Sequence, residues 1–412
     1  MKERKLVQVS ANEVELGMFV SQLDRPWTET PFMFQGFLLT KREDLQVIKD
    51  TCSYVFVDVL KTTSESRARL IPPKQTGRNP RYGQITYQVK HEFEKEIPLA
   101  SREYHATLKD VKELLTHVRF HAPVELGAVR DQVNACVDSV ERNPAATAWL
   151  SRIKHVDEYT AEHCLNVGLL AAGLGRHLGL KRKQLENLAL CGILHDVGKM
   201  LVDQELLNKP GPLTPEEFNE VKMHTVRSAE LLGRDNSIPR EAKYAALHHH
   251  ERIDGAGYPR GIRGERISFY TKVISIVDAF DAITSERCYS SAKSPAEALK
   301  IIYENRSKQF DEELSIKFIE FMGLYPPGSI VEMSTKEVGV VLSSDPKHRL
   351  HPRVLIVLNA NKEPTEHRVV DLKNRDAVDR MGIKASLDDK AYGIDIEKIS
   401  QSMAKNSSAD AA

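Results

Sequence analysis

The chain opens with short apolar stretches that are rich in β-branched and aromatic residues, at 6–9, 18–20, 32–39 and 54–60. A polar-patterned segment over residues 43–50 separates the last two of them. Short runs of this composition are typical of strands, and the polar-patterned segment favours a helix. Residues 1–70 are therefore predicted to form a small α+β module.

The middle of the chain is predicted to be helical. A segment at 71–80, rich in proline, glycine and polar residues, precedes apolar positions that recur at helical spacing over 106–140. We interpret residues 71–144 as a linker with connecting helices, and a helix-helix seam that would form a homodimer is a further hypothesis. Helical spacing continues over residues 145–325, where eight of the fifteen histidines fall: His155, His163, His177, His195, His224, His248, His249 and His250.

The pattern changes again after residue 325. Apolar runs at 339–342, 353–358 and 368–372 alternate with turn-rich segments, and a tail rich in serine and alanine begins at about residue 406. We expect a small β-rich extension over 326–405 and a disordered tail over 406–412. The predicted fold class is a multidomain chain, in which a central all-α helical bundle is flanked by a small N-terminal α+β module and a small C-terminal β-rich appendage.

Composition narrows the class of protein. The chain has 58 Lys and Arg residues against 58 Asp and Glu residues, so it lacks the broad positive field of a generic DNA or RNA binder. No run approaches the roughly 20 apolar residues that span a bilayer, and no apolar signal segment follows the first residues. The five cysteines never form a C-x-x-C pair and are interpreted as small buried thiols. We expect a cytoplasmic protein without membrane insertion.

Histidine and aspartate residues in apolar segments carry the candidate chemistry. His195 and Asp196 lie in a segment that is apolar on nearly every face, where an ionised carboxylate needs a nearby cation. Taken alone, a salt bridge from Asp196 to Lys199, or capping of the following turn by Asp196, explains the pair better than catalysis does. His163 and His224 lie on the inward faces of other predicted helices, and each alone is more often a satisfied core histidine than a metal ligand.

Two further segments make a purely structural explanation harder. The adjacent His248, His249 and His250 have poor helix propensity and precede a loop with two glycines and a proline. The predicted helix over 271–285 places Asp278 and Asp281 on one face; a surface position explains Asp281, but Asp278 is flanked by apolar residues and needs a cation. Imidazole and carboxylate ligands without thiolates suit Fe, Mn, Zn or Ni. Two ions about 3.5–4 Å apart would use the whole set and could attack a phosphate ester.

The order of these residues resembles the HD-GYP family, bacterial phosphodiesterases of the HD superfamily that degrade cyclic di-GMP. The resemblance rests on His163, an HDxGK motif at 195–199, His224, an HHExxDGxGYP motif at 249–259, and Asp278. It spans roughly residues 150–325. The N-terminal module also resembles the small domain of unassigned function that often precedes HD-GYP domains.

The resemblance implies a binuclear site. One ion would be held by His163, His195, Asp196 and Asp278, and Asp196 would bridge to a second ion held by His224, His249 and His250. Fe or Mn are the metals that the family suggests, with Ni, Zn and Mg as further candidates. Asp196 and Lys199 are implied to be catalytic, and the implied substrate-binding residues are Lys199, Asp281, Ser285, Arg287, Gly257, Tyr258 and Pro259. The loop with Gly257, Tyr258 and Pro259 is also implied to meet diguanylate cyclase (GGDEF) partners.

Three positions depart from the family pattern. Tyr159 stands where some members have a glutamate that holds a third metal, so two ions are expected. Ser290 stands where many members have a second cation, and Lys293 lies one turn later as a candidate substitute. Ile253 stands where tryptophan is common, a change expected to affect packing.

The predicted function is a metal-dependent phosphodiesterase that hydrolyses cyclic di-GMP to linear pGpG, with onward cleavage to GMP left open. A hydroxide bridging the two ions would attack phosphorus in line, while the metals and Lys199 stabilise the added charge. One alternative is a catalytically weak receptor for cyclic di-GMP or pGpG that signals through protein partners. The other is an HD phosphohydrolase that acts on a different nucleotide. The intact ligand set disfavours the first alternative, and the GYP loop disfavours the second.

Overall fold

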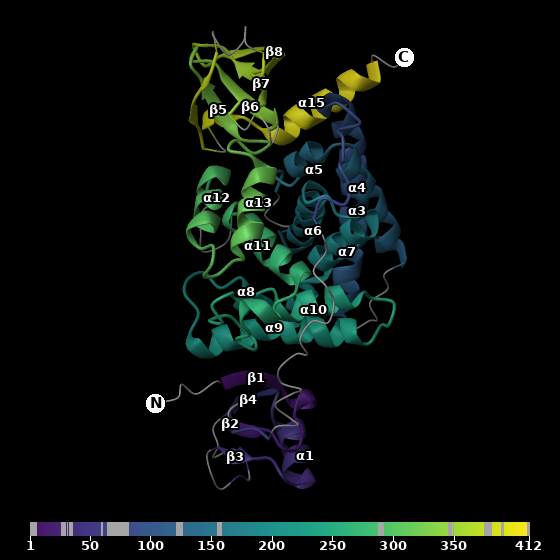
Figure 1. Cartoon of the computed structure of the whole chain (residues 1–412), viewed down its shortest axis with the longest axis vertical. Helices are drawn as coiled ribbons and strands as arrows, with labels where there is room; N and C mark the ends of the chain where they lie inside the picture. Colours follow the sequence, from purple (N-terminus) through teal and green to yellow (C-terminus); the bar gives the residue numbers. More distant parts are fainter. Residues whose placement is uncertain are drawn as a thin grey trace.

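The structure, a computed structural model, describes residues 6–25, 30, 32, 36–58, 61–63, 82–120, 127–154, 159–286, 292–344, 348, 350–374, 381–388 and 391–409. A small N-terminal module, a helical body and a C-terminal sheet follow one another along the longest axis of the molecule (Figure 1). This arrangement confirms a mostly helical centre with a small sheet on either side.

The N-terminal module is a four-stranded antiparallel sheet with one helix against it. Its elements are β1 (Leu6–Ser10), η1 (Ala11–Glu13), β2 (Phe19–Leu23), β3 (Phe37–Leu38), α1 (Arg42–Thr51) and β4 (Tyr54–Asp58), and the strand order is β1-β4-β2-β3. Val55 and Val57 of β4 share the module's buried core with Ile48 of α1. Because side chains alternate along a strand, Tyr54 and Phe56 lie on the opposite face, where they join a separate apolar cluster.

The helical body is built from α-helices and short 3-10 turns. They are α3 (Phe93–Arg119), α4 (Gly127–Arg142), α5 (Pro144–Leu150), α6 (Tyr159–His177), α7 (Arg182–Leu194), η4 (Val197–Leu201), α8 (Gln204–Leu207), α9 (Pro215–Gly233), α10 (Arg240–His248), η5 (Gly264–Arg266), α11 (Phe269–Ile283), α12 (Pro295–Glu304) and α13 (Glu312–Met322). The apolar positions of α3 and α4, such as Val111 and Val137, are buried in the body's own core. The hypothesis of a dimer seam along these positions is therefore wrong.

Helix α3 begins at Phe93, well before the predicted start at residue 106, and contains Pro98. Phe93 and Ile97 are completely buried, and Phe93 packs edge-on against Trp149 with ring centroids 5.3 Å apart. Packing of this apolar face offsets the backbone hydrogen bond that proline removes, so the helix continues through a residue that usually ends one.

Two close approaches between elements position the residues of the candidate site. A Cβ atom added to Gly192 of α7 would lie 2.3 Å from the backbone nitrogen of Gly168 on α6. A Cβ atom on Gly198 of η4 would lie 2.2 Å from the carbonyl oxygen of His224 on α9. Only glycine allows backbones to approach so closely. The two contacts draw α6, α7 and α9 together around the turn that carries Asp196.

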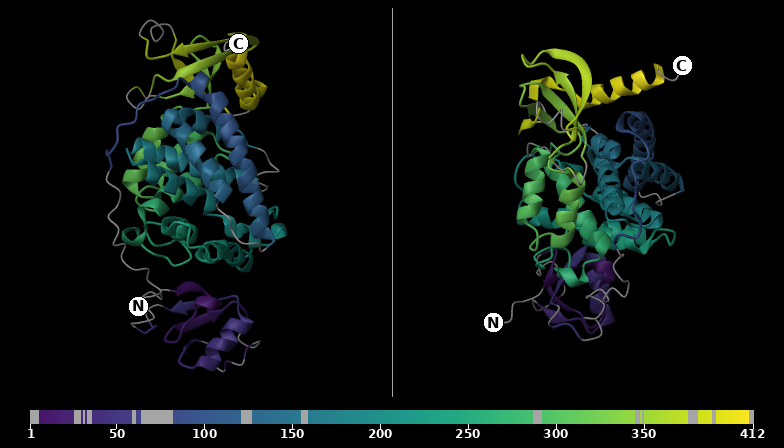
Figure 2. Two further views of the ribbon diagram at one scale, coloured as in Figure 1. Left: turned by 90° about the vertical axis from the view of Figure 1, so that its right-hand side faces the viewer. Right: turned by 45° about the horizontal axis from the view of Figure 1, so that its top comes forward.

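The C-terminal part is a five-stranded antiparallel sheet followed by a helix. The strands are β5 (Ile330–Met333), β6 (Val338–Ser343), β7 (Arg353–Leu358), β8 (Pro364–Asp371) and β9 (Ile383–Ser386), in the order β8-β7-β6-β5-β9, and η6 (Ala391–Gly393) leads to α15 (Ile396–Ala409). Helix α15 lies beside α3, and Figure 2 shows it projecting from the sheet end of the molecule.

Helix α15 corrects the prediction of a disordered tail from residue 406, because it continues to Ala409, and residues 410–412 lie outside the described residues. The Trp149 indole donates a hydrogen bond to the Ser400 hydroxyl at 2.6 Å, and Ile399 is buried in the main core. These contacts anchor helix α15, which the serine- and alanine-rich composition of the tail did not indicate. Among the described residues, no helix combines the length and the apolar character that crossing a bilayer requires.

Candidate metal centre

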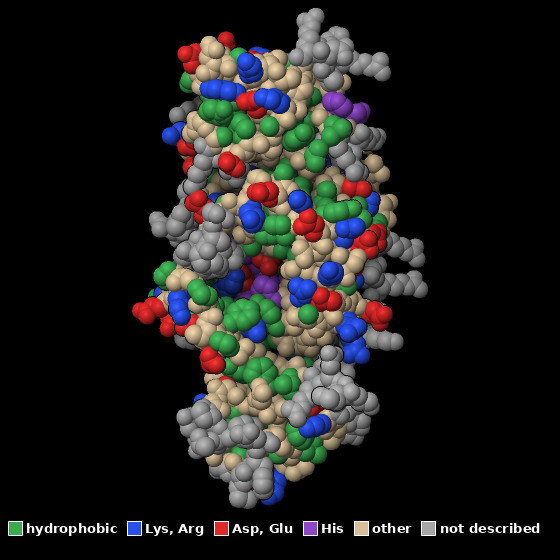
Figure 3. Space-filling view, turned by 90° about the vertical axis from the view of Figure 1, so that its left-hand side faces the viewer, with side chains coloured by type: hydrophobic (Ala, Val, Ile, Leu, Met, Phe, Trp, Pro, Cys, Tyr) green, Lys and Arg blue, Asp and Glu red, His purple; other side chains and the backbone are tan. Residues whose placement is uncertain are grey.

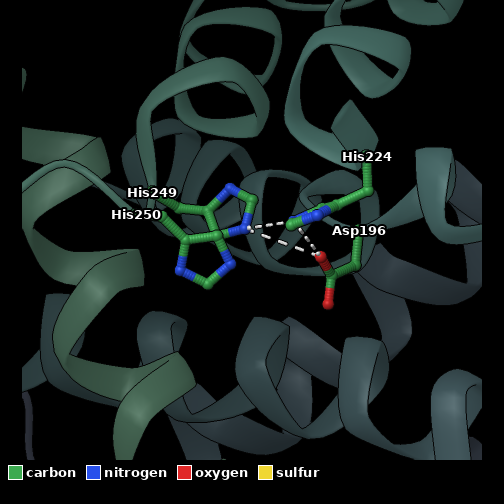
Figure 4. A group of neighbouring side chains, drawn as sticks. All are labelled: Asp196, His224, His249 and His250. Carbon is green, nitrogen blue, oxygen red and sulfur yellow. Dashed lines mark hydrogen bonds and ion pairs between the residues drawn. The ribbon is translucent and has the colours of Figure 1, made fainter. Parts of the chain in front are cut away.

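The structure brings all seven predicted metal ligands into two adjoining groups. Asp196, His224, His249 and His250 form one group, which Figure 4 shows, and His163, His195 and Asp278 form the other. Within each group, one potential ligand atom from every residue lies within 4.8 Å of the others. The ligands come from α6, the α7–η4 junction, α9, the end of α10 and α11. Each group contains enough nitrogen and oxygen ligands to hold a divalent ion.

Asp196 lies between the two groups and faces both. Its Oδ2 atom lies 3.1 Å from His195 Nε2 and 3.6 Å from His163 Nε2. Its Oδ1 atom lies 3.2 Å from His224 Nε2 and 3.5 Å from His249 Nε2. Asp278 completes the first group, with Oδ1 3.1 Å from His163 Nε2. One carboxylate is thus shared, which is the geometry that a bridging ligand requires.

Backbone carbonyl groups fix which nitrogen of each imidazole faces the centre. The Nδ1 atoms of His195, His224 and His249 lie 2.6, 2.7 and 3.0 Å from the carbonyl oxygens of residues 192, 221 and 246. A carbonyl only accepts hydrogen bonds, so each Nδ1 carries the proton and each neutral ring presents an Nε2 lone pair to the centre. His195 Nε2 and Asp196 Oδ1 are buried with no hydrogen-bond partner among the described residues. Converging lone pairs in a buried site fit metal cations.

The charges of the site also favour cations. Burial alone would lower the pKa of His163, but hydrogen bonds to Asp196, Asp278 and Asp281 raise it to about 10. Burial raises the pKa of Asp196, whereas the charge of Lys199 and the hydrogen bond from His163 lower it, and the net result lies well below the ordinary value. The carboxylates are therefore ionised within a buried pocket, where a positive charge is needed to offset them.

Asp281 and Ser285 lie behind the ligands, which corrects the prediction that they bind substrate. Asp281 Oδ2 accepts a hydrogen bond from His163 Nδ1 at 2.7 Å, and Oδ1 lies 2.9 Å from Lys154 Nζ. The Ser285 hydroxyl donates to the Asp281 carbonyl and accepts from Lys154 Nζ, both at 2.6 Å. Asp281 follows Asp278 by one helical turn, so it meets the outer nitrogen of the His163 ring instead of the cleft.

Lys154 is a site residue that sequence reasoning missed. It lies after α5 in a short polar segment without apolar periodicity, and nothing in that segment marks a buried role. In the structure its ammonium group joins Asp281, Thr284 and Ser285. A chain of contacts therefore runs from Lys154 through Asp281 to the candidate ligand His163, the arrangement that orients a metal-binding histidine.

Lys199 donates a hydrogen bond to Asp196 Oδ2, so the structure contains the salt bridge that explains this motif in structural terms. Its side chain remains 21% exposed. Arg287, Cys288 and Ser290 lie outside the described residues, and so does His155.

A cleft of about 340 Å³ opens over the candidate metal centre. Its lining includes the ligands His249, His250 and Asp278, two residues of the GYP loop, Gly257 and Tyr258, and Phe218, Lys222, Glu251, Arg252, Ala256, Ser275, Ala279 and Gln309. Figure 3 shows a hollow with histidine and acidic side chains at its floor. The Tyr258 ring packs on His250 with centroids 4.8 Å apart, which joins the loop to the metal centre.

The GYP loop is held from inside and from outside the helical body. Inside, the buried Glu251 carboxylate accepts hydrogen bonds from the backbone nitrogens of Arg260 at 2.6 Å and Ile262 at 3.0 Å. Outside, the N-terminal module reaches the loop: the Gln8 backbone N–H donates to the Pro259 carbonyl at 3.4 Å, and Glu13 lies 3.6 Å from Arg260. The same module packs on α9 and α10 through Tyr54, Phe56, Met223, Val226 and Leu247.

Comparison with known proteins places these features in a family. The HD domain family matches residues 140–314, and a domain of unknown function, DUF3391, matches residues 6–129. The cyclic di-GMP phosphodiesterase PA4108 of Pseudomonas aeruginosa is 33% identical over 386 residues, which cover 91% of each chain.

Two further relatives are similar to this chain over about half of their own length. The cyclic di-GMP phosphodiesterase response regulator RpfG of Xanthomonas campestris is 34% identical over 184 residues, 44% of this chain and 45% of that protein. The 3'3'-cGAMP-specific phosphodiesterase 3 of Vibrio cholerae is 31% identical over 224 residues, 52% of this chain and 48% of that protein. With the HDxGK and GYP motifs gathered around one centre, and with a relative matched over nearly its whole length, the chain belongs to the HD-GYP family.

Proposed function

We propose that the chain is a metal-dependent phosphodiesterase that hydrolyses cyclic di-GMP to linear pGpG. The observation that carries the proposal is the single carboxylate of Asp196, whose two oxygens face two separate sets of imidazole ligands. The Pseudomonas aeruginosa relative, named as a cyclic di-GMP phosphodiesterase and matched over 91% of its length, supports the choice of substrate.

In this proposal His163, His195, Asp196 and Asp278 hold one ion, and Asp196, His224, His249 and His250 hold the other. When bound, two such ions supply Lewis acidity to a water molecule and to the scissile phosphate. Iron or manganese are the metals proposed, and nickel, zinc and magnesium suit the same ligand types.

The protein contributes orientation and charge. The carbonyl groups of residues 192, 221 and 246 hold three imidazoles in the ring orientation that presents Nε2. Lys199, beside Asp196, is proposed to offset negative charge as it develops on the phosphate. The GYP loop forms one wall of the cleft, and its Tyr258 ring packs on His250.

A GGDEF cyclase that bound the GYP loop, as proposed, would compete with the N-terminal module of the same chain. The N-terminal module already engages the Pro259 carbonyl and the Arg260 side chain. A cyclase would therefore bind the remaining loop surface or displace the module.

A second candidate substrate is 3'3'-cGAMP, because the Vibrio cholerae relative with that named specificity is 31% identical over 224 residues. The two nucleotides share the cyclic sugar-phosphate ring and differ in one base. The metal centre would therefore meet the same phosphodiester in both nucleotides, and only the contacts between the cleft wall and one base would differ.

The test is to purify the protein without oxygen, measure bound metal, and follow cyclic di-GMP, 3'3'-cGAMP and pGpG by chromatography. We expect about two metals per chain, loss of cyclic di-GMP and appearance of pGpG. Asp196→Ala should lose both metal and turnover, whereas Asp131→Ala, at an exposed position on α4, should keep both. Turnover retained by Asp196→Ala would contradict the binuclear site. Bound nucleotide without turnover in the metal-loaded protein would favour a receptor.

A further inference from the structure

A cyclic dinucleotide has two phosphates and two bases, so the proposed function leaves half of the substrate to be held away from the metal centre. The metal centre acts on one phosphodiester at a time. In the sequence, Ser290 stands where the family pattern has a second cation. A positive charge and an apolar surface on the cleft wall would hold that other half.

Among the described residues that line the cleft, Lys222 of α9 is the cation that is available to a ligand. Its ammonium group lies 3.2 Å from the Asn219 amide oxygen and makes no ion pair with a carboxylate among the residues that the structure describes. Arg252 also lines the cleft, but its Nε and Nη2 atoms bind the Asp254 carboxylate at 3.1 and 2.7 Å. Lys199 is bound to Asp196. Of these cations, Lys222 alone faces the cleft without a bound acid.

Aromatic rings surround Lys222. Its ammonium lies 4.3 Å from the ring centroid of Phe218 and 5.6 Å from that of Tyr258. Phe218 lies one turn earlier on α9 and is 44% exposed, so part of its ring is accessible from the cleft. The rings of Phe218 and Tyr258 are 6.3 Å apart and nearly perpendicular.

This aromatic and cationic wall begins at the metal centre. The Tyr258 ring packs on the candidate ligand His250 at 4.8 Å, so only the width of Tyr258 separates Lys222 from a metal-binding imidazole. An exposed aromatic face stacks on nucleotide bases, and an ammonium group beside it binds a phosphate. The spacing suits a compact molecule that presents one phosphate to the metals and the rest to this wall.

We infer that Phe218 and Lys222 form the subsite for the second nucleotide of a cyclic dinucleotide: Lys222 binds the phosphate that is not being hydrolysed, and Phe218 stacks on a base. The inference rests on the proposed function. Under this inference, the second cation of the substrate cleft is Lys222 on α9 instead of a residue at position 290. A merely structural alternative is that Lys222 only packs on Phe218 to stabilise the helix surface.

The experiment compares two substrates on the manganese-loaded, full-length protein: cyclic di-GMP and bis(p-nitrophenyl) phosphate, which has a single phosphate. Removing one charge-assisted hydrogen bond should raise KM for cyclic di-GMP about tenfold to a hundredfold in Lys222→Gln. The kcat for cyclic di-GMP, the metal content and the kcat/KM for the small ester should stay unchanged. Lys222→Arg should recover most of the affinity. Phe218→Ala should also raise KM for cyclic di-GMP.

The matched control is Lys300→Gln, which removes a lysine paired with Glu304 on the exposed surface of α12 and should change neither substrate. An unchanged KM for cyclic di-GMP in Lys222→Gln would overturn the inference, and so would an equal loss on both substrates or a loss of metal. If the wild-type protein fails to hydrolyse cyclic di-GMP, the proposed function fails by itself. Calorimetric binding of cyclic di-GMP to the same variants would then decide on the subsite, because a dissociation constant unaffected by Lys222→Gln would refute it.

Discussion

Gly198→Ala tests whether the close approach of η4 to α9 creates the shared carboxylate. The added Cβ atom would lie 2.2 Å from the carbonyl oxygen of His224, 2.5 Å from the backbone nitrogen of Ser228 and 2.7 Å from its hydroxyl oxygen. Two of these three atoms belong to the backbone of α9, so a side-chain rotation cannot relieve the overlap. The turn that carries Asp196 must move away from the helix that carries His224.

The size of that movement follows from the same distances. Increasing the Cβ to oxygen separation from 2.2 Å to 3.0 Å, below which real Cβ contacts essentially never occur, requires a displacement of about 0.8 Å. Ligand positions in a working metal site are defined to about 0.2 Å. We therefore expect metal affinity to fall at least as far as the 10–100-fold typical of disturbed ligand surroundings. Overpacking should also lower the free energy of unfolding by about 1–3 kcal/mol.

The assay is a calorimetric titration of the metal-free protein with Mn²⁺, together with metal analysis of the purified protein. The matched control is Gly233→Ala at the end of the same helix α9, where an added Cβ atom meets nothing within 4 Å. We expect the control to bind metal like the wild-type protein. A Gly198→Ala protein with two tightly bound metals would refute the reasoning, because it would show that the shared carboxylate does not depend on this contact.

Four further predictions concern the support of the site. Lys154→Met should weaken metal binding about 10–100-fold by leaving Asp281 without its cation, and Lys154→Arg should weaken it less. Equal Mn²⁺ affinities for the wild-type protein and both variants would argue against a role of the Lys154–Asp281–His163 contacts in metal binding. Glu251→Ala leaves two backbone N–H groups of the GYP loop without their acceptor, so urea unfolding should report a loss of about 1–3 kcal/mol for each, and an unchanged midpoint would contradict this. Adding Mn²⁺ at a hundred times its dissociation constant should raise the free energy of unfolding by about 2.7 kcal/mol per site, a gain that Asp196→Ala should lack. Burial lowers the pKa of His248 from 6.5 to about 3. Between these two pH values the histidine is therefore protonated in the unfolded chain and neutral in the folded chain. The metal-free protein should therefore lose stability from pH 7 towards pH 4, with a shallower slope in His248→Gln; equal slopes would exclude this histidine as a cause.

The candidate metal ligands could be singled out from sequence because most of them are polar or charged groups where the surrounding pattern is apolar, and the resemblance to the family then implied how they divide between two ions. Asp196 and Asp278 are acids in segments that the apolar pattern buries, and the structure finds both among imidazoles. Short apolar runs rich in β-branched and aromatic residues likewise indicated the N-terminal sheet, and apolar runs between turn-rich segments indicated the C-terminal sheet. Burial and periodicity are local properties, so a single sequence carries them.

Contacts between distant segments were beyond such reasoning. The pattern was explained by a surface position for Asp281, and the resemblance implied a contact with substrate. Its side chain is instead buried against His163, because the orientation of that ring depends on how α6 and α11 pack. Lys154 and Lys222 are surface-type residues by composition, and only tertiary packing brings one beneath the metal centre and the other into the cleft. Docking of β1 on the GYP loop joins residues 8 and 259, for which no periodicity gives a signal.

The distribution of the candidate ligands over five helical segments also sets an order of events during synthesis. A chain emerges from the ribosome from its N-terminus, and His163 precedes Asp278 by 115 residues. The group around His224 is complete once residue 250 has emerged, whereas the group around His163 waits for α11. If both groups hold ions as proposed, the chain order would favour loading of the His224 group first. The second ion would enter only after α11 has packed, and its identity would depend on the ligand geometry and on the metals then available.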